Sequence, residues 1–205
     1  MRLYLSSFKL GQHVDKLLSL YGKDRSVGYI ANALNHVSDK HWLSDWVSGD
    51  IELLTDAGLD VRPLDLRDYF SPNRDIADVI SDLGGIWISG GNVFVLRQAM
   101  KLSGLDAYLL DGQQTKDLVY GAYSAGCCVL SPTLAPYARV DDPGIHPYPE
   151  IQTTLWDGLD ILDFAFMPHF QSQHSESDLI DKGIAYCVDR KIPYRAFRDG
   201  EVLVL

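Results

Sequence analysis

The chain has 205 residues, of which 46 % are hydrophobic and 22 % charged, and 18 Lys and Arg against 28 Asp and Glu give it a formal net charge of −10. This composition excludes a disordered chain and is typical of a globular protein long enough to bury its own core. The negative charge argues against nucleic acid or an anionic membrane surface as the main partner, and no apolar run approaches the ~20 residues that cross a bilayer.

The cysteines and the N-terminal segment indicate a cytoplasmic protein. The apolar run within residues 1–17 is too short for a signal peptide. Cys127, Cys128 and Cys187 have no CxxC spacing, and an odd number suits no disulfide framework. We therefore expect buried thiols that pack as small apolar groups in a reducing compartment.

Short apolar runs alternate with longer amphipathic stretches along the chain. In chain order, the pattern predicts a strand at 2–6, a helix at 11–21, a strand at 26–31, a long helix between Ser38 as N-cap and Gly58 as stop, and strands at 61–66 and 86–89. It then predicts a helix at 93–102, a strand at 118–122, a helix at 125–130, a strand at 164–167, a helix at 176–189 and a hairpin at 195–205 around Asp199 and Gly200. This alternation predicts an α/β fold in one domain, 1–205, whose mostly parallel sheet has helices on both faces.

Residues 131–160 stand apart because they are rich in proline and show no clear period. A long irregular segment inside a compact domain is often functional. The other interpretation is a surface loop without a functional role, and the sequence is compatible with either.

The segment Gly121-Ala-Tyr-Ser-Ala-Gly126 joins a predicted buried strand to a short helix. At such a sharp turn the Ser124 hydroxyl leaves the sheet at a helix N-terminus, where backbone N–H groups can face a developing negative charge. The small residues around the serine relieve crowding. Ser124 is therefore a candidate nucleophile, with an ordinary helix N-cap as the alternative.

A second turn, Ser89-Gly-Gly-Asn92, also follows a strand and precedes a helix. Its glycines let the backbone approach a bound group and aim N–H donors at it. Because both turns fall at the carboxyl edge of a parallel sheet, the N–H groups of Gly91 and Ala125 are candidates for an oxyanion hole. A tight turn with nothing bound is the alternative.

The segment Met167-Pro-His-Phe170 places His169 after a later strand, at what we expect to be the same edge. A neutral imidazole there could accept the Ser124 proton and return it to a leaving amine. His174 lies five residues further on in a polar stretch, so we expect it to be more exposed.

Together, SGGN after one strand, GAYSAG after the next and MPHF after a later one resemble peptidase family S51, whose members include aspartyl dipeptidase (peptidase E) and cyanophycinase. The resemblance runs from the first strand to the C-terminal segment, although only these three motifs are specific. It implies a three-layer αβα fold of the class I glutamine-amidotransferase-like (flavodoxin-like) type. It also implies a serine peptidase that hydrolyses small peptides such as dipeptides through an acyl-enzyme, without metal or cofactor. The residues that match are Ser124 as nucleophile, His169 as general base, and Gly91 and Ala125 as oxyanion donors.

The same resemblance proposes the acid of the triad. In peptidase E a Glu precedes a Gly in the C-terminal hairpin, and the matching position here is Asp199, before Gly200. A carboxylate there would hold His169 in the required tautomer. Asp141 and Asp142, in the VDDP segment downstream of the nucleophile, are the alternatives.

Substrate specificity does not carry over from the family. No residue can be assigned to the recognition of an N-terminal aspartate. Arg195 and Arg198 are the cations closest in sequence to Asp199, but strand alternation could turn either of them to solvent.

Two other functions are compatible with the same motifs. A non-catalytic protein could bind a small anion or metabolite at this sheet edge, with Ser124 as a helix cap. Alternatively, Cys127 or Cys128 could be the nucleophile of an amidotransferase-like or redox site, although both fall in a helical stretch where thiols usually pack.

A metal site is the weakest alternative. His169, His174 and Asp178 are close in sequence, but Gln171 and Ser172 between them are poor zinc ligands. We expect a small peptide as the ligand and neither nucleic acid nor a membrane as a partner, and the sequence is compatible with a homodimer.

Overall fold

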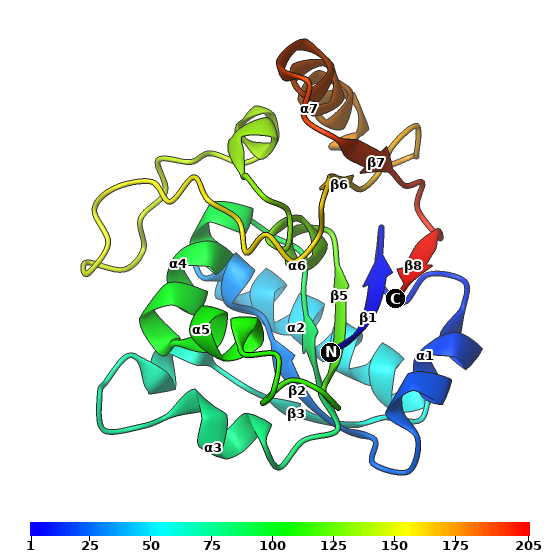
Figure 1. Ribbon diagram of the computed structural model, residues 1–205, viewed down its shortest axis with the longest axis vertical. Coiled ribbons are helices and arrows are strands. Elements are labelled where there is room, and N and C mark those ends of the chain that lie inside the picture. Colours follow the sequence, from blue (N-terminus) through cyan, green and yellow to red (C-terminus); the bar gives the residue numbers. More distant parts are fainter.

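The computed structural model describes residues 1–205. A six-stranded sheet forms its middle layer, with strand order β3-β2-β4-β5-β1-β8 (Figure 1). The strands are β1 (Arg2–Ser6), β2 (Ser26–Ile30), β3 (Asp60–Pro63), β4 (Gly85–Ile88), β5 (Val119–Tyr123) and β8 (Val202–Val204). Strands β1 to β5 pair in parallel, and β8 adds to β1 in antiparallel orientation. The predicted, mostly parallel α/β fold is confirmed.

Alternating side chains of these strands form two cores, one on each face of the sheet. Tyr4 and Trp87 join the core that includes residues of α1 (Val14–Tyr21) and α2 (Lys40–Asp56). Leu5 and Ile88, one position further along their strands, join the larger core on the opposite face. That core includes residues of α3 (Ile76–Ile80), α4 (Val93–Ser103), α5 (Leu105–Leu110) and α6 (Ala125–Cys128). Strands buried on both faces give the three layers. None of the helices combines the length and apolar character that a bilayer crossing requires.

The long helix α2 begins one residue later than predicted. The Asp39 carboxylate, not the Ser38 hydroxyl, accepts the free N–H groups of His41 and Trp42. Asp39 therefore caps the helix, because an extended residue with a side-chain oxygen satisfies the first unpaired donors. The helix ends at Asp56, and Gly58 follows with φ +99°, in agreement with the predicted stop.

The C-terminal part of the chain corrects two predictions. β6 (Ala165–Met167) is not part of the main sheet, because it pairs in parallel with β7 (Tyr194–Ala196) in a separate two-stranded sheet. β7 and β8 do not form the predicted hairpin, because β8 pairs with β1 instead. The link between them is held by other segments: the Asp199 N–H donates to the Ser172 hydroxyl, and the Gly200 carbonyl accepts the Gln12 N–H. We call β6, β7 and the helix between them, α7 (Ser177–Arg190), the annex; it lies beside the carboxyl end of the main sheet (Figure 1).

The proline-rich segment 131–160 is irregular, as predicted, and contains a short 3-10 helix at Ala135–Arg139. Two further 3-10 helices lie at Asn32–Leu34 and Leu66–Tyr69. Tyr137 connects the irregular segment to the annex, since its hydroxyl donates to the Phe166 carbonyl at 2.9 Å and contacts the Ser131 hydroxyl at 2.7 Å. The segment therefore holds β6 in place.

Candidate active site

Ser124 occupies the sharp turn between β5 and α6. Its backbone has φ 48° and ψ −116°, a conformation that costs a non-glycine residue ~1–3 kcal/mol and persists only where the surroundings impose it. A Cβ atom at Gly126 would lie 2.7 Å from the Ile88 carbonyl oxygen, so the helix can approach the sheet only with glycine there. The Ser124 side chain makes no capping hydrogen bond, which argues against its being a simple helix cap.

The structure brings three of the predicted residues together. The Ser124 hydroxyl lies 3.0 Å from His169 Nε2, and His169 Nδ1 lies 2.7 Å from Asp199 Oδ1. A carboxylate only accepts hydrogen bonds, so in the neutral ring the proton sits on Nδ1 and leaves the Nε2 lone pair for the serine. Such contacts suit a nucleophile, a base and an orienting acid.

Ser7 joins this group from the main sheet, directly after β1. Its hydroxyl accepts the His169 N–H at 2.8 Å and donates to Asp199 Oδ1 at 2.9 Å. Since β1 and β5 are neighbours in the sheet, Ser7 fixes the histidine backbone and the acid relative to the Ser124 turn. Ser7 was not predicted as a site residue, because a serine directly after a strand carries no distinctive motif.

His169 is held neutral. Its side chain is 1 % exposed, and its backbone has φ 58°. Burial, aided by the neighbouring His174, lowers the pKa of His169 to about 4, although the Asp199 carboxylate opposes this shift. The imidazole is therefore ready to accept a proton at neutral pH.

The two candidate oxyanion donors border the serine. Gly91 has φ 135°, and a Cβ atom there would lie 2.8 Å from the Ala33 carbonyl group, so this close turn requires glycine. The N–H groups of Gly91 and Ala125 donate to no acceptor within the chain. Both residues line a narrow recess with Ser124. This placement suits an oxyanion hole.

The alternative acids lie elsewhere. The Asp141 carboxylate accepts the Val93 N–H at 2.8 Å, at the start of α4. The Asp142 carboxylate accepts the Gly144 N–H at 2.8 Å. Neither contacts His169, whereas Asp199 does. Asp141 lines the recess beside Ser124, where burial, despite the hydrogen bond from Val93, raises its pKa to about 7.

The cysteines are not arranged as nucleophiles. Cys127 and Cys128 are buried within α6, and burial raises the pKa of both thiols well above the usual range. Their sulfur atoms face the carbonyl groups of Ser6 and Phe166. A buried thiol in apolar surroundings is inert.

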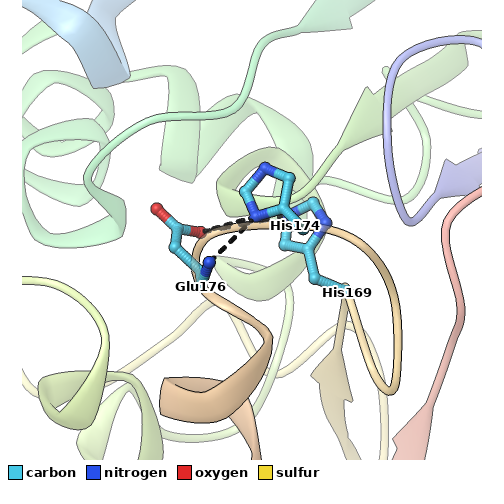
Figure 2. Close-up of side chains that lie close together, drawn as sticks. All are labelled: His169, His174 and Glu176. Atoms are coloured by element: carbon cyan, nitrogen blue, oxygen red, sulfur yellow. Dashed lines mark hydrogen bonds and ion pairs between the residues drawn. The ribbon is translucent and has the colours of Figure 1, made fainter.

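Figure 2 shows His174 and Glu176 beside His169. The two imidazole rings stack at 3.7 Å with an interplanar angle of 8°, and Glu176 lies 3.9 Å from His174 Nδ1. His174 is more exposed than His169, as predicted. The third potential metal ligand within 4.8 Å of the others is Glu176, and not Asp178, which the sequence offered only in the weakest alternative.

The cluster of His169, His174 and Glu176 fits a metal ion poorly. Stacked rings direct their in-plane lone pairs side by side instead of toward one point, whereas zinc requires tetrahedral convergence. Both nitrogen atoms of His169 also have other partners, Asp199 and Ser124.

A cavity of about 270 Å³ opens beside the Ser124 hydroxyl and the His169 ring. Phe8, Trp42, Trp46 and Tyr123 line one part of it, and we call these four residues the aromatic wall. This role could not be predicted from sequence position, because Trp42 and Trp46 fit the apolar pattern of a core helix.

The chain resembles known proteins along its length. The model of peptidase family S51 matches residues 6–204. Uncharacterized peptidases of Listeria innocua and Listeria monocytogenes are 33 % and 31 % identical over 87 residues, 42 % of this chain. These alignments span only 39 % and 40 % of the two relatives, about two fifths of their length.

Solved structures share the fold. A candidate peptidase E of Listeria monocytogenes superposes with a TM-score of 0.70 at 22 % identity, covering 100 % of this chain and 97 % of its own. A peptidase from an acI-B1 actinobacterium has a TM-score of 0.65 at 18 % identity, covering 100 % of this chain and 82 % of its own.

Proposed function

The chain belongs to peptidase family S51, and from this premise we propose that it is a serine peptidase that hydrolyses short peptides, dipeptides above all, with Ser124, His169 and Asp199 as its catalytic triad. The contact that carries the proposal is the 3.0 Å hydrogen-bond distance between the Ser124 hydroxyl and His169 Nε2. The cavity of about 270 Å³ supports a small substrate, because its volume lies just below the ~300–1,000 Å³ range of small-ligand sites.

The first half of the reaction forms an acyl-enzyme. Ser124 Oγ attacks the scissile carbonyl carbon while His169 Nε2 takes the hydroxyl proton. The N–H groups of Gly91 and Ala125 hold the resulting oxyanion. Collapse of the tetrahedral intermediate breaks the C–N bond, and His169 gives its proton to the leaving amine.

The second half returns the enzyme to its starting state. Water loses a proton to His169 and attacks the ester carbonyl, and the same two N–H groups hold the new oxyanion. The serine leaves with the proton from His169. Throughout, Asp199 keeps the ring oriented and stabilises the imidazolium that forms twice in each cycle.

The decisive experiment combines an active-site probe with turnover. A fluorophosphonate should label the purified protein, and the protein should release free amino acids from dipeptides. Ser124→Ala should lose labelling, and both Ser124→Ala and His169→Ala should lose ~10⁴-fold or more in kcat. Circular dichroism should show that both variants stay folded.

Ser71→Ala serves as the matched control, because Ser71 is an exposed serine outside the site. This variant should keep both labelling and turnover. Near-normal turnover by folded Ser124→Ala would refute the proposal. Absence of labelling and of dipeptide hydrolysis in the unmodified protein would favour the non-catalytic binding function instead.

A further inference from the structure

The aromatic wall lies next to the reacting groups. Trp42 and Trp46, one turn apart on α2, stack with ring centroids 5.0 Å apart, and Trp42 remains 42 % exposed. Phe8 packs edge-on against the His169 ring at 5.8 Å. Tyr123 directly precedes Ser124. A substrate whose carbonyl meets the Ser124 hydroxyl therefore has these rings within its own binding cavity.

No Lys or Arg lines this cavity. Glu176 is its one carboxylate. Lys9 lies 3.6 Å from the centroid of the Trp46 ring, but its ammonium group is paired with the buried carboxylate of Asp50. An acidic substrate side chain would thus lose its hydration without gaining a Lys or Arg partner, and would face Glu176 as a like charge.

The two arginines near the acid in sequence are also turned elsewhere. The Arg195 guanidinium stacks over the Phe164 ring at 4.4 Å, and Arg198 donates to the Gln171 side chain at 2.8 Å. Neither residue lines the cavity. The site therefore lacks the bidentate clamp with which a guanidinium recognises a carboxylate.

We propose that this peptidase selects short peptides with a large apolar or aromatic side chain next to the scissile bond, and that Trp42 is the residue that recognises it. The inference rests on the proposed peptidase function and adds the substrate class. A half-exposed indole can bury apolar area against such a side chain and pair with an aromatic ring. The carboxylate of Glu176 suits the ammonium group of a free N-terminus and disfavours an acidic side chain.

The test measures kcat/KM of the unmodified protein for two dipeptide series, X-Ala and Ala-X, with X as Phe, Leu, Ala or Asp. In at least one series, kcat/KM for the dipeptides with X as Phe or Leu should exceed that for X as Ala by ~10-fold or more. The dipeptide with X as Asp should have the lowest kcat/KM. Trp42→Ala should remove ~10-fold of that preference, mainly by raising KM for the Phe and Leu dipeptides. Trp42→Phe should restore much of the preference.

Trp156→Ala is the matched control. Trp156 is 46 % exposed and packs against Phe94, outside the cavity, so its removal should leave the preference unchanged. A preference for Asp in both series would overturn the inference. The inference would also be overturned if Trp42→Ala lowered kcat/KM for every dipeptide by the same factor. Either result leaves the proposed peptidase function standing, whereas failure to hydrolyse any dipeptide would remove both.

Discussion

The two halves of the candidate site come from two differently built regions. The main sheet contributes Ser124, Gly91 and Ala125 at the ends of adjacent strands, where strand pairing fixes their spacing. The annex and the link that follows it contribute His169 and Asp199 from outside that sheet. One half is therefore positioned by continuous backbone pairing, and the other by a small number of specific contacts.

Those contacts can be named. The Phe170 N–H donates to the Phe197 carbonyl, and the Phe197 N–H donates to the Met167 carbonyl, which closes the annex around His169. Ser7 then ties both His169 and Asp199 to the main sheet. The difference teaches that changes on the annex side should alter catalysis while the main sheet stays intact.

After His169 itself, the largest effect on that side is expected at Asp199. Asp199→Asn keeps the size of the side chain but removes the charge that orients His169 and stabilises its imidazolium form, so kcat should fall by ~10³–10⁴-fold. Steady-state kinetics on a dipeptide, with thermal unfolding as a folding check, would measure this loss. Asp142→Asn, at an exposed carboxylate away from the ring, should stay close to the unmodified protein. If Asp142→Asn lowers kcat more than Asp199→Asn does, the acid of the triad is not Asp199.

A smaller effect is expected where the two regions meet. Ser7→Ala removes the acceptor of the His169 N–H and a donor to Asp199, so the ring should be held less accurately and kcat should fall by about tenfold. Ser7→Thr keeps the hydroxyl and should recover part of the loss. If Ser7→Ala changes only the melting temperature and not kcat, Ser7 stabilises the fold without positioning the base.

The smallest effect concerns pH within the neutral range. A base must be unprotonated to act, and the lowered pKa of His169, about 4, keeps it so at pH 6–8. kcat/KM should therefore vary less than about twofold over that range and decline only as pH approaches 4. Asp141, whose pKa is about 7, and Glu176, whose pKa is raised by burial, line the same recess and could add a second step, so the profile should be repeated with the double variant Asp141→Asn/Glu176→Gln. An acid limb near pH 6.5 that survives in this variant would show that burial does not control His169.

The lowered pKa of His169 also makes the free energy of unfolding depend on pH. As pH falls, the unfolded chain binds a proton at His169 near pH 6.5, whereas the folded protein binds it only near pH 4. The contribution of this residue to the free energy of unfolding is therefore complete above pH 6.5 and decreases as pH falls toward 4.

Much of the main sheet could be predicted from the sequence because its signals are local. Continuous apolar runs located β2, β4 and β5 to within one or two residues, and the glycine-rich turns after β4 and β5 marked the serine and the donors. The annex was harder to predict. Asp199-Gly200 fits a hairpin locally, but the flanking strands pair with distant segments of the chain: β7 pairs with β6, and β8 pairs with β1. Partner choice depends on tertiary packing that a short window of sequence does not contain.

The candidate site divides in the same way. His169 and Ser124 were proposed from motifs, and the structure places them in contact across 45 residues of sequence. Ser7, Glu176 and the aromatic wall had no motif, since each becomes part of the site only through long-range packing. Two short helices, α3 and α5, were also missed, because segments of five and six residues show too little periodicity.

The backbone of Ser124 has a consequence for how this fold can change. Glycine is the residue that accepts such positive φ values freely, so Ser124→Gly would relieve the strain of this turn, whereas Ser124→Ala would not. A chain chosen only for thermal tolerance would therefore discard this side chain. The serine therefore lowers the stability of the turn at the position proposed for the nucleophile.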